Sequence, residues 1–234
     1  MKVLTILSGG AAQGLVKSLS AAFEARSGWR IDGEFGAVGT MADKLRAGAA
    51  ADLVILTDAI VEALEREGVV VAGSATPIGL VETAVAARNG DPVPAIDDAD
   101  HLRTAFLAAD ALFVPDMQSS TAGRHVAAVL DRLGIAAQMR SRLQESPNGA
   151  TAMRKLADSA FARPLGCTQA TEIIATPGLT LVGPLPPQCA LATVYTAAVL
   201  RRAADPAIAR TLIDLLTAPS NADVRARAGF VARA

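Results

Sequence analysis

The stretch KVLTILSGGAAQGLVKSLSAAF, residues 2–23, contains the pattern from which the fold class can be predicted. Residues 2–7 form a short apolar run, as expected of a β-strand covered on both faces, and two glycines end it. Apolar side chains from Leu15 to Phe23 then recur at helical spacing. The stretch therefore predicts a strand, a glycine turn and a helix, which is the repeating unit of α/β proteins.

The same alternation continues along the rest of the chain. Apolar residues from Val126 to Leu133 recur at helical spacing, and Gly134 is placed to end that helix. Because short strands alternate with helices, we predict an α/β fold with mostly parallel sheets. The strands are expected at Val3–Leu7, Ile31–Phe35, Leu53–Leu56, Ala84–Ala87, Ala111–Val114 and Leu165–Thr168.

The length of 234 residues allows two lobes, and two Gly/Pro-rich stretches suggest where the chain passes between them. These stretches are Gly73–Gly79 and Pro177–Pro187. We therefore expect a discontinuous first lobe, residues 1–80 plus 188–234, and a second lobe, residues 81–187. A ligand cleft is expected between the two lobes.

Composition excludes several classes of function. Lys and Arg (22) nearly balance Asp and Glu (23), and aromatic residues are few, so nucleic acid is not an expected partner. No run approaches the ~20 apolar residues of a membrane helix. The N-terminus predicts a strand and no signal peptide, so we expect a cytoplasmic protein, or a periplasmic one if a signal has been removed. The two cysteines lack the spacing of a metal site, and no metal or cofactor is expected.

Several predicted strand-to-helix junctions are rich in small, hydroxylated or amide residues. The first turn of a helix carries unpaired N–H groups and partial positive charge, and small residues let a ligand approach them. Such junctions suit an anion site, although Ser, Thr and Asn at a helix start also serve as ordinary caps. No Rossmann or P-loop spacing is present. The junctions lie at Ser8–Gln13, Phe35–Thr40, Asp116–Gly123, Ser146–Gly149 and Gly166–Gln169.

The stretch from Gly39 to Ile55, GTMADKLRAGAAADLVI, resembles the molybdate-binding-protein family. That family shows a small-residue turn, an amphipathic helix, then Gly-Ala-Pro-Ala-Asp and a strand. Residues 119–125, 148–153, 168–173 and 181–186 are also similar to its patterns, so the resemblance covers nearly the whole chain. It implies a two-lobed type II periplasmic-binding-protein fold that closes on a ligand by a hinge motion.

The resemblance also implies which residues contact the ligand. Three residues of the same junctions, Ser8, Ser119 and Thr168, are added to the residues that the resemblance implies. The complete predicted set of ligand contacts comprises Ser8, Gly9, Gly10, Val38, Gly39 and Thr40 in the first lobe, and Ser119, Ser120, Thr121, Ala122, Asn148, Thr168 and Gln169 in the second. The chain departs from the family where molybdate binders place Ser in both first-lobe loops and Tyr in the last loop. Gly10, Val38 or Gly39, and Gln169 stand there, so a carboxylate ligand fits at least as well as a tetrahedral oxyanion.

Two hypotheses follow from the resemblance. The first is a monomeric solute-binding protein for a small anion, with an ABC transporter permease as its partner if the protein is exported. The second is a cofactor-free isomerase of a small di- or tricarboxylate, because an aconitate isomerase resembles the same family. A cytoplasmic ligand sensor ranks last, since no DNA-binding segment supports it.

The isomerase hypothesis requires a base, and His125 and Glu172 are the predicted catalytic residues. Cys167 is a further candidate base, and Arg124 and Arg163 could hold carboxylates. Each has a structural alternative. His125 and the arginines could be surface groups, Glu172 could favour the helix dipole, and Cys167 could be an inert buried thiol. We predict a structural role for Asp52, which precedes a strand.

Overall fold

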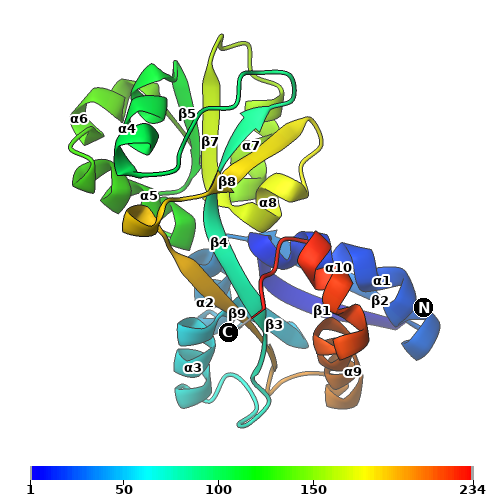
Figure 1. Cartoon of the computed structure of the whole chain (residues 1–234). Helices are drawn as coiled ribbons and strands as arrows, with labels where there is room; N and C mark the ends of the chain where they lie inside the picture. Colours follow the sequence, from blue (N-terminus) through cyan, green and yellow to red (C-terminus); the bar gives the residue numbers. More distant parts are fainter. Residues whose placement is uncertain (1, 233–234) are drawn as a thin grey trace. The chain divides into compact units, whose positions relative to one another are not determined.

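The computed structural model describes residues 2–232, which form two compact α/β units. Unit 1 consists of the described residues up to Val81 and from Thr193 onward, and unit 2 of Glu82–Ala192. The chain thus passes from one unit to the other twice, and unit 1 is built from both ends of the sequence. Figure 1 shows the elements of each unit with the labels used below.

In unit 1 the strands follow the order β2-β1-β3-β9, and β4, whose start belongs to unit 1, is the next strand after β9. The first three strands are parallel, and β9 runs antiparallel to β3. The elements of unit 1 are β1 (Lys2–Gly9), the 3₁₀ turn Gly10–Ala12, α1 (Gln13–Ser27), β2 (Trp29–Gly36), α2 (Val38–Arg46), β3 (Leu53–Thr57), α3 (Asp58–Arg66), the start of β4 (Thr76–Arg88), β9 (Ala192–Val199), α9 (Pro206–Thr217), the 3₁₀ turn Pro219–Asn221 and α10 (Ala222–Arg227).

Helices cover both faces of the unit 1 sheet. Figure 1 shows α1, α9 and α10 on one side of its strands and α2 and α3 on the other. Every residue of β3 is therefore buried, which explains its continuous apolar sequence. The edge strand β2 alternates between half-buried and exposed residues along most of its length, so it reads as a mixed apolar and polar sequence.

Unit 2 has a sheet in the order β4-β7-β5-β6, and β8 pairs with β4 in addition. Strands β5, β6 and β7 are mutually parallel, whereas β4 is antiparallel to β7 and to β8. The elements are the rest of β4, α4 (Ala99–Ala108), β5 (Ala111–Pro115), α5 (Thr121–Arg132), α6 (Ala136–Met139), the 3₁₀ turn Arg140–Arg142, β6 (Leu143–Ser146), α7 (Gly149–Ala157), β7 (Pro164–Gln169), α8 (Ala170–Ile174), β8 (Leu179–Pro184) and the 3₁₀ turn Pro187–Cys189.

Alternate residues of the unit 2 strands pack into two different apolar layers. Val85 and Ala87 of β4 contact the layer formed by α4, α5 and α6, whereas Ala84 and Ala86 contact the layer formed by α7 and α8. This two-residue alternation is the side-chain period of a strand. Both faces are apolar, so the run from 84 to 87 shows no polar alternation in the sequence.

All six strands predicted from the sequence are present. Three further strands, β6, β8 and β9, were not predicted. Strand β6 has only one buried residue and a largely polar sequence, so it gives no apolar signal. Strand β8 has no buried residue, and its apolar residues lie in the Gly/Pro-rich stretch Pro177–Pro187 that was expected to connect the lobes. The antiparallel pairings of β4, β8 and β9 also make the sheets more mixed than expected.

The second passage between the units lies after Ala192 and not at residue 187. Hydrogen bonds of Thr83 explain this position. Its backbone N–H donates to the oxygen of Leu191 at 2.9 Å, and its oxygen accepts from the N–H of Leu185 at 3.0 Å. These bonds hold the segment after β8 against unit 2. Among the described residues, no helix has both the length and the apolar character required to cross a bilayer.

Candidate functional site

In unit 1, the two predicted ligand loops follow β1 and β2, and these neighbouring strands end side by side. The register of β1 and β2 pairs Ser8 with Phe35 and Gly9 with Gly36. The loops are in contact, because a Cβ added to Gly9 would lie 2.8 Å from Cγ1 of Val38. Glycine at position 9 is therefore required by the close approach of the second loop.

The start of α2 offers backbone N–H groups to a ligand. Its N-cap residue, Ala37, has no side chain that can accept a hydrogen bond. Val38 and Gly39 open the helix, followed by Thr40, whose side chain is exposed. A helix start without a capping side chain favours a bound anion. Ser8 contributes less, since its hydroxyl donates to the backbone oxygen of Gly9 at 2.9 Å.

In unit 2, the loop before α5 holds itself together by internal hydrogen bonds. The hydroxyl of Ser119 donates to Asp116 Oδ1 at 2.6 Å, and Ser120 caps α5 by accepting from the N–H of Gly123 at 3.4 Å. The Ser119 hydroxyl and backbone N–H groups hold the pKa of the Asp116 carboxyl below its usual range. Thr121 and Ala122 follow in the first turn of the helix.

Asn148 caps α7, accepting a hydrogen bond from the N–H of Thr151 at 2.9 Å. The next residue, Gly149, lies directly against a buried carboxyl group. A Cβ at Gly149 would lie 1.8 Å from Oε2 of Glu172 and 2.2 Å from Oγ1 of Thr168. The absence of a side chain at position 149 therefore lets Glu172 reach the start of α7.

The carboxyl group of Glu172 is buried and hydrogen-bonded. Thr168 Oγ1 donates to its Oε2 at 2.6 Å, and the backbone N–H groups of Ala150 and Gln169 also donate to it. Burial penalises the charged form more than these donors favour it, which raises the pKa of Glu172 from 4.5 to about 7. The group can therefore hold or release a proton near neutral pH.

Five side chains of unit 2 have buried polar atoms without a hydrogen-bond partner in the described part of the chain. Four of these residues are themselves buried, whereas Ser159 is half-buried. Both amide atoms of Gln169 are unpaired although the residue is only 3% exposed. The other three buried residues are Thr83, Ser146 and Thr171, each with an unpaired hydroxyl. Thr83 and Gln169 are direct partners across β4 and β7. Because buried polar groups are normally paired, these unpaired ones are candidate ligand contacts.

Of the four buried residues, only Gln169 belonged to the predicted set. Ser146 lies in a predicted strand-to-helix junction, and Thr171 lies in a stretch similar to the molybdate-binding-protein family, but neither belongs to the predicted set of ligand contacts. Thr83 directly precedes the predicted strand Ala84–Ala87, and no sequence motif there indicates a ligand contact. Its pairing with Gln169 depends on the antiparallel register of two strands that are far apart in the sequence.

The other candidate side chains are engaged in structural contacts. His125 Nε2 lies 2.7 Å from the backbone oxygen of Cys189 and must donate to it, since a carbonyl only accepts. Burial raises the pKa of the Cys167 thiol to about 12, so it is protonated at neutral pH. Arg124 donates to the oxygen of Gln118 at 2.9 Å, and Arg163 pairs with Asp110 at 2.9 Å.

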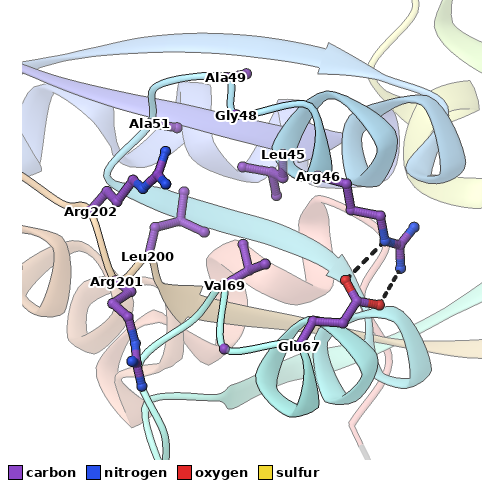
Figure 2. A pocket seen from close by; sticks show the side chains of 11 residues that line it. Leu45, Arg46, Gly48, Ala49, Ala51, Glu67, Val69, Leu200, Arg201 and Arg202 are labelled. Carbon is purple, nitrogen blue, oxygen red and sulfur yellow. Dashed lines mark hydrogen bonds and ion pairs between the residues drawn. The ribbon is translucent and has the colours of Figure 1, made fainter.

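A cavity of about 290 Å³ lies elsewhere in unit 1. Figure 2 shows its rim, where Arg46 and Glu67 face each other and form two hydrogen bonds of 3.0 Å. Leu200 lines it beyond the end of β9, where β9 runs beside the amino end of β3. The predicted loops follow the carboxyl ends of the parallel strands. The cavity therefore lies at the opposite edge of the sheet, and none of its lining residues was predicted to contact the ligand.

Comparison with known proteins gives a family match over most of the chain. A family model described as bacterial extracellular solute-binding protein matches residues 4–231. Aconitate isomerase from Pseudomonas sp. is 27% identical over 221 residues, which cover 91% of this chain and 81% of that protein.

Solved structures confirm the type II periplasmic-binding-protein fold, and they include a molybdate-binding protein and a tungstate ABC transporter. The periplasmic molybdate-binding protein of Azotobacter vinelandii has a TM-score of 0.82 and 18% identity, covering 99% of this chain and all of that chain. The tungstate ABC transporter structure from Geobacter sulfurreducens has a TM-score of 0.70 and 16% identity, covering 95% of this chain and 97% of that one.

Proposed function

Because this chain belongs to the bacterial extracellular solute-binding protein family, we propose that it binds a small anion, an oxyanion or a small carboxylate. The observation that carries the proposal is the set of buried, unpaired polar groups on Thr83, Ser146, Gln169 and Thr171. Leaving such groups without a partner costs about 1–3 kcal/mol each. A ligand that pairs with them would recover part of that cost on binding.

Unit 1 supports the proposal with backbone donors. The uncapped start of α2 presents the N–H groups of its first turn, and Gly9, which has no side chain, lies close to Val38 and to the ring of Tyr195. Dipoles and neutral donors of this kind bind an anion without a salt bridge. We therefore include in the proposal that the ligand contacts predicted from the sequence, in both units, bind this anion.

A thermal-shift screen of the whole chain tests the proposal. The panel contains molybdate, tungstate, sulfate, phosphate and a series of di- and tricarboxylates that includes both aconitate isomers. A ligand that binds only the folded state raises the melting temperature, by an amount that grows with its concentration. We expect at least one of these anions to do so, and a flat response to the whole panel would contradict the proposal.

If the protein is exported, we propose that it delivers the ligand to the membrane permease of an ABC transporter. The fold shared with the tungstate ABC transporter structure supports this partner. Binding without turnover of any carboxylate in the panel is the expected behaviour of such a protein.

An isomerase of a small di- or tricarboxylate is a second candidate, and Glu172 favours it. A general base works best when its pKa lies near the working pH, and burial brings Glu172 to about 7. The 27% identity to an aconitate isomerase directs the assay to the two aconitate isomers. Conversion of one aconitate isomer to the other by the purified protein would establish the isomerase function.

The Glu172→Gln variant then tests the role of the carboxyl group. It should abolish conversion and keep ligand binding, because the amide retains the size of the side chain but cannot accept a proton at neutral pH. His125→Gln tests the second predicted catalytic residue in the same way. Conversion unaffected by both substitutions would show that neither residue is the base.

A further inference from the structure

The unpaired amide of Gln169 restricts the chemistry of the ligand beyond its negative charge. A glutamine amide has an NH₂ group that donates and a carbonyl oxygen that accepts. Both are buried without a partner, so exchanging the two atoms by rotation would still leave one unpaired donor group and one unpaired acceptor. A ligand that satisfies this residue must therefore both accept and donate hydrogen bonds.

Fully deprotonated oxyanions cannot meet this requirement. Molybdate, tungstate and sulfate carry only acceptor oxygens, which would pair with the NH₂ group of Gln169 and leave its carbonyl oxygen buried and unpaired. An unsatisfied buried acceptor costs free energy that a matching ligand avoids. The Thr83 hydroxyl, on the residue that pairs with Gln169 across the ladder, makes no hydrogen bond to the amide in the structure and so does not supply the donor that its carbonyl oxygen lacks.

Thr83 extends the same polar surface. It is 1% exposed, lies directly opposite Gln169 in the β4–β7 ladder and has an unpaired hydroxyl. Residues paired across an antiparallel ladder project to the same face, with their Cβ atoms about 4.5–5.5 Å apart. A hydroxyl can either donate or accept, so Thr83 can adapt to whichever group the ligand presents beside the amide.

We infer that the ligand carries its own hydrogen-bond donor beside its anionic oxygens, and that Gln169 with Thr83 selects for that donor. This inference rests on the proposed anion-binding function and names the ligand chemistry at the same site. Two kinds of anion have the required chemistry. One is a hydroxycarboxylate, with a C–OH group next to a carboxylate, and the other is hydrogenphosphate, with a P–OH group.

Matched ligand pairs test the inference by isothermal titration calorimetry of the whole chain at pH 8. Malate is compared with succinate, citrate with tricarballylate, and hydrogenphosphate with sulfate. The donor-bearing member of at least one pair should bind about tenfold more tightly, the effect of one good hydrogen bond. The pair that shows the preference identifies the source of the donor.

The Gln169→Met variant tests whether this residue provides the selection. It should bring the two affinities of the preferred pair to within about twofold of each other. It should also raise the melting temperature of the ligand-free protein, because it removes two unpaired polar atoms. Gln138→Met, at an exposed position of α6, is the matched control and should change neither quantity. Thr83→Val, which keeps the shape of the side chain, should weaken the same preference if Gln169→Met does not fold.

The outcomes separate this inference from the proposed function. Tighter or equal binding of the members without a donor in every pair would overturn the inference and leave anion binding intact. A preference that survives both Gln169→Met and Thr83→Val would also overturn it. If the wild-type protein binds no anion of any series, the proposed function fails, and the inference fails with it.

Discussion

Glu172 links a single side chain to the pH dependence of stability. Its pKa is raised from 4.5 to about 7 by burial, so the folded state holds a proton over a range where the unfolded chain has released it. The stabilisation is therefore complete below pH 4.5 and is lost as the pH rises through 7. A shift of this size corresponds to about 3 kcal/mol.

We predict that Glu172→Gln removes the loss of stability that the ionisation of Glu172 causes as the pH rises. Between pH 5 and pH 8, the unfolding free energy of the wild type should fall by about 2.5 kcal/mol relative to that of the variant. Urea unfolding at a series of pH values measures both curves. Glu24→Gln, at an exposed position of α1, is the control and should run parallel to the wild type. Parallel curves for Glu172→Gln would mean that Glu172 ionises normally.

At the level of the element, the start of α2 shows a conflict between stability and binding. Ala37 occupies the N-cap position with no side-chain hydrogen bond, so the first turn keeps its donors free. A serine at an N-cap typically contributes about 1 kcal/mol relative to alanine. The sequence thus omits a common stabilising residue at the place where the proposed function needs unoccupied N–H groups.

We predict that Ala37→Ser raises the unfolding free energy by about 1 kcal/mol and weakens anion binding severalfold, because the new hydroxyl occupies one of those donors. Denaturant unfolding measures the first effect and calorimetry the second. Ala47→Ser, at the other end of the same helix, should leave the affinity unchanged. Stabilisation of α2 together with unchanged affinity would exclude its first turn from the site.

At the scale of the whole molecule, Asp52 joins the two distant parts of the chain that build unit 1. Its Oδ2 accepts from the N–H of Thr5 at 2.8 Å, and its Oδ1 accepts from the N–H of Ala204 at 2.8 Å. The side chain of Asp52 is buried, so these bonds are partly shielded from water. The structural role predicted for Asp52 is therefore confirmed by its contacts.

We predict that Asp52→Ala lowers the unfolding free energy by about 3 kcal/mol, because two backbone N–H groups lose a charged acceptor. Asp52→Asn should cost less, since its amide keeps one acceptor oxygen. Asp214→Ala, on the exposed face of α9, is the control and should change stability by less than about 0.5 kcal/mol. Thermal and urea unfolding check all three variants, and equal effects of Asp52→Ala and Asp214→Ala would contradict the prediction.

The sequence by itself determined the fold class, six of the strands and the small, polar character of the strand-to-helix junctions. These features depend on local patterns, because a buried strand or a helix start leaves its signal in neighbouring residues. The tertiary structure alone decided that β8 and β9 are strands and that Thr83 faces Gln169. It also decided that Gly149 lets Glu172 reach the start of α7. These features depend on pairings between distant segments, and burial without a partner becomes visible only when such segments are packed together.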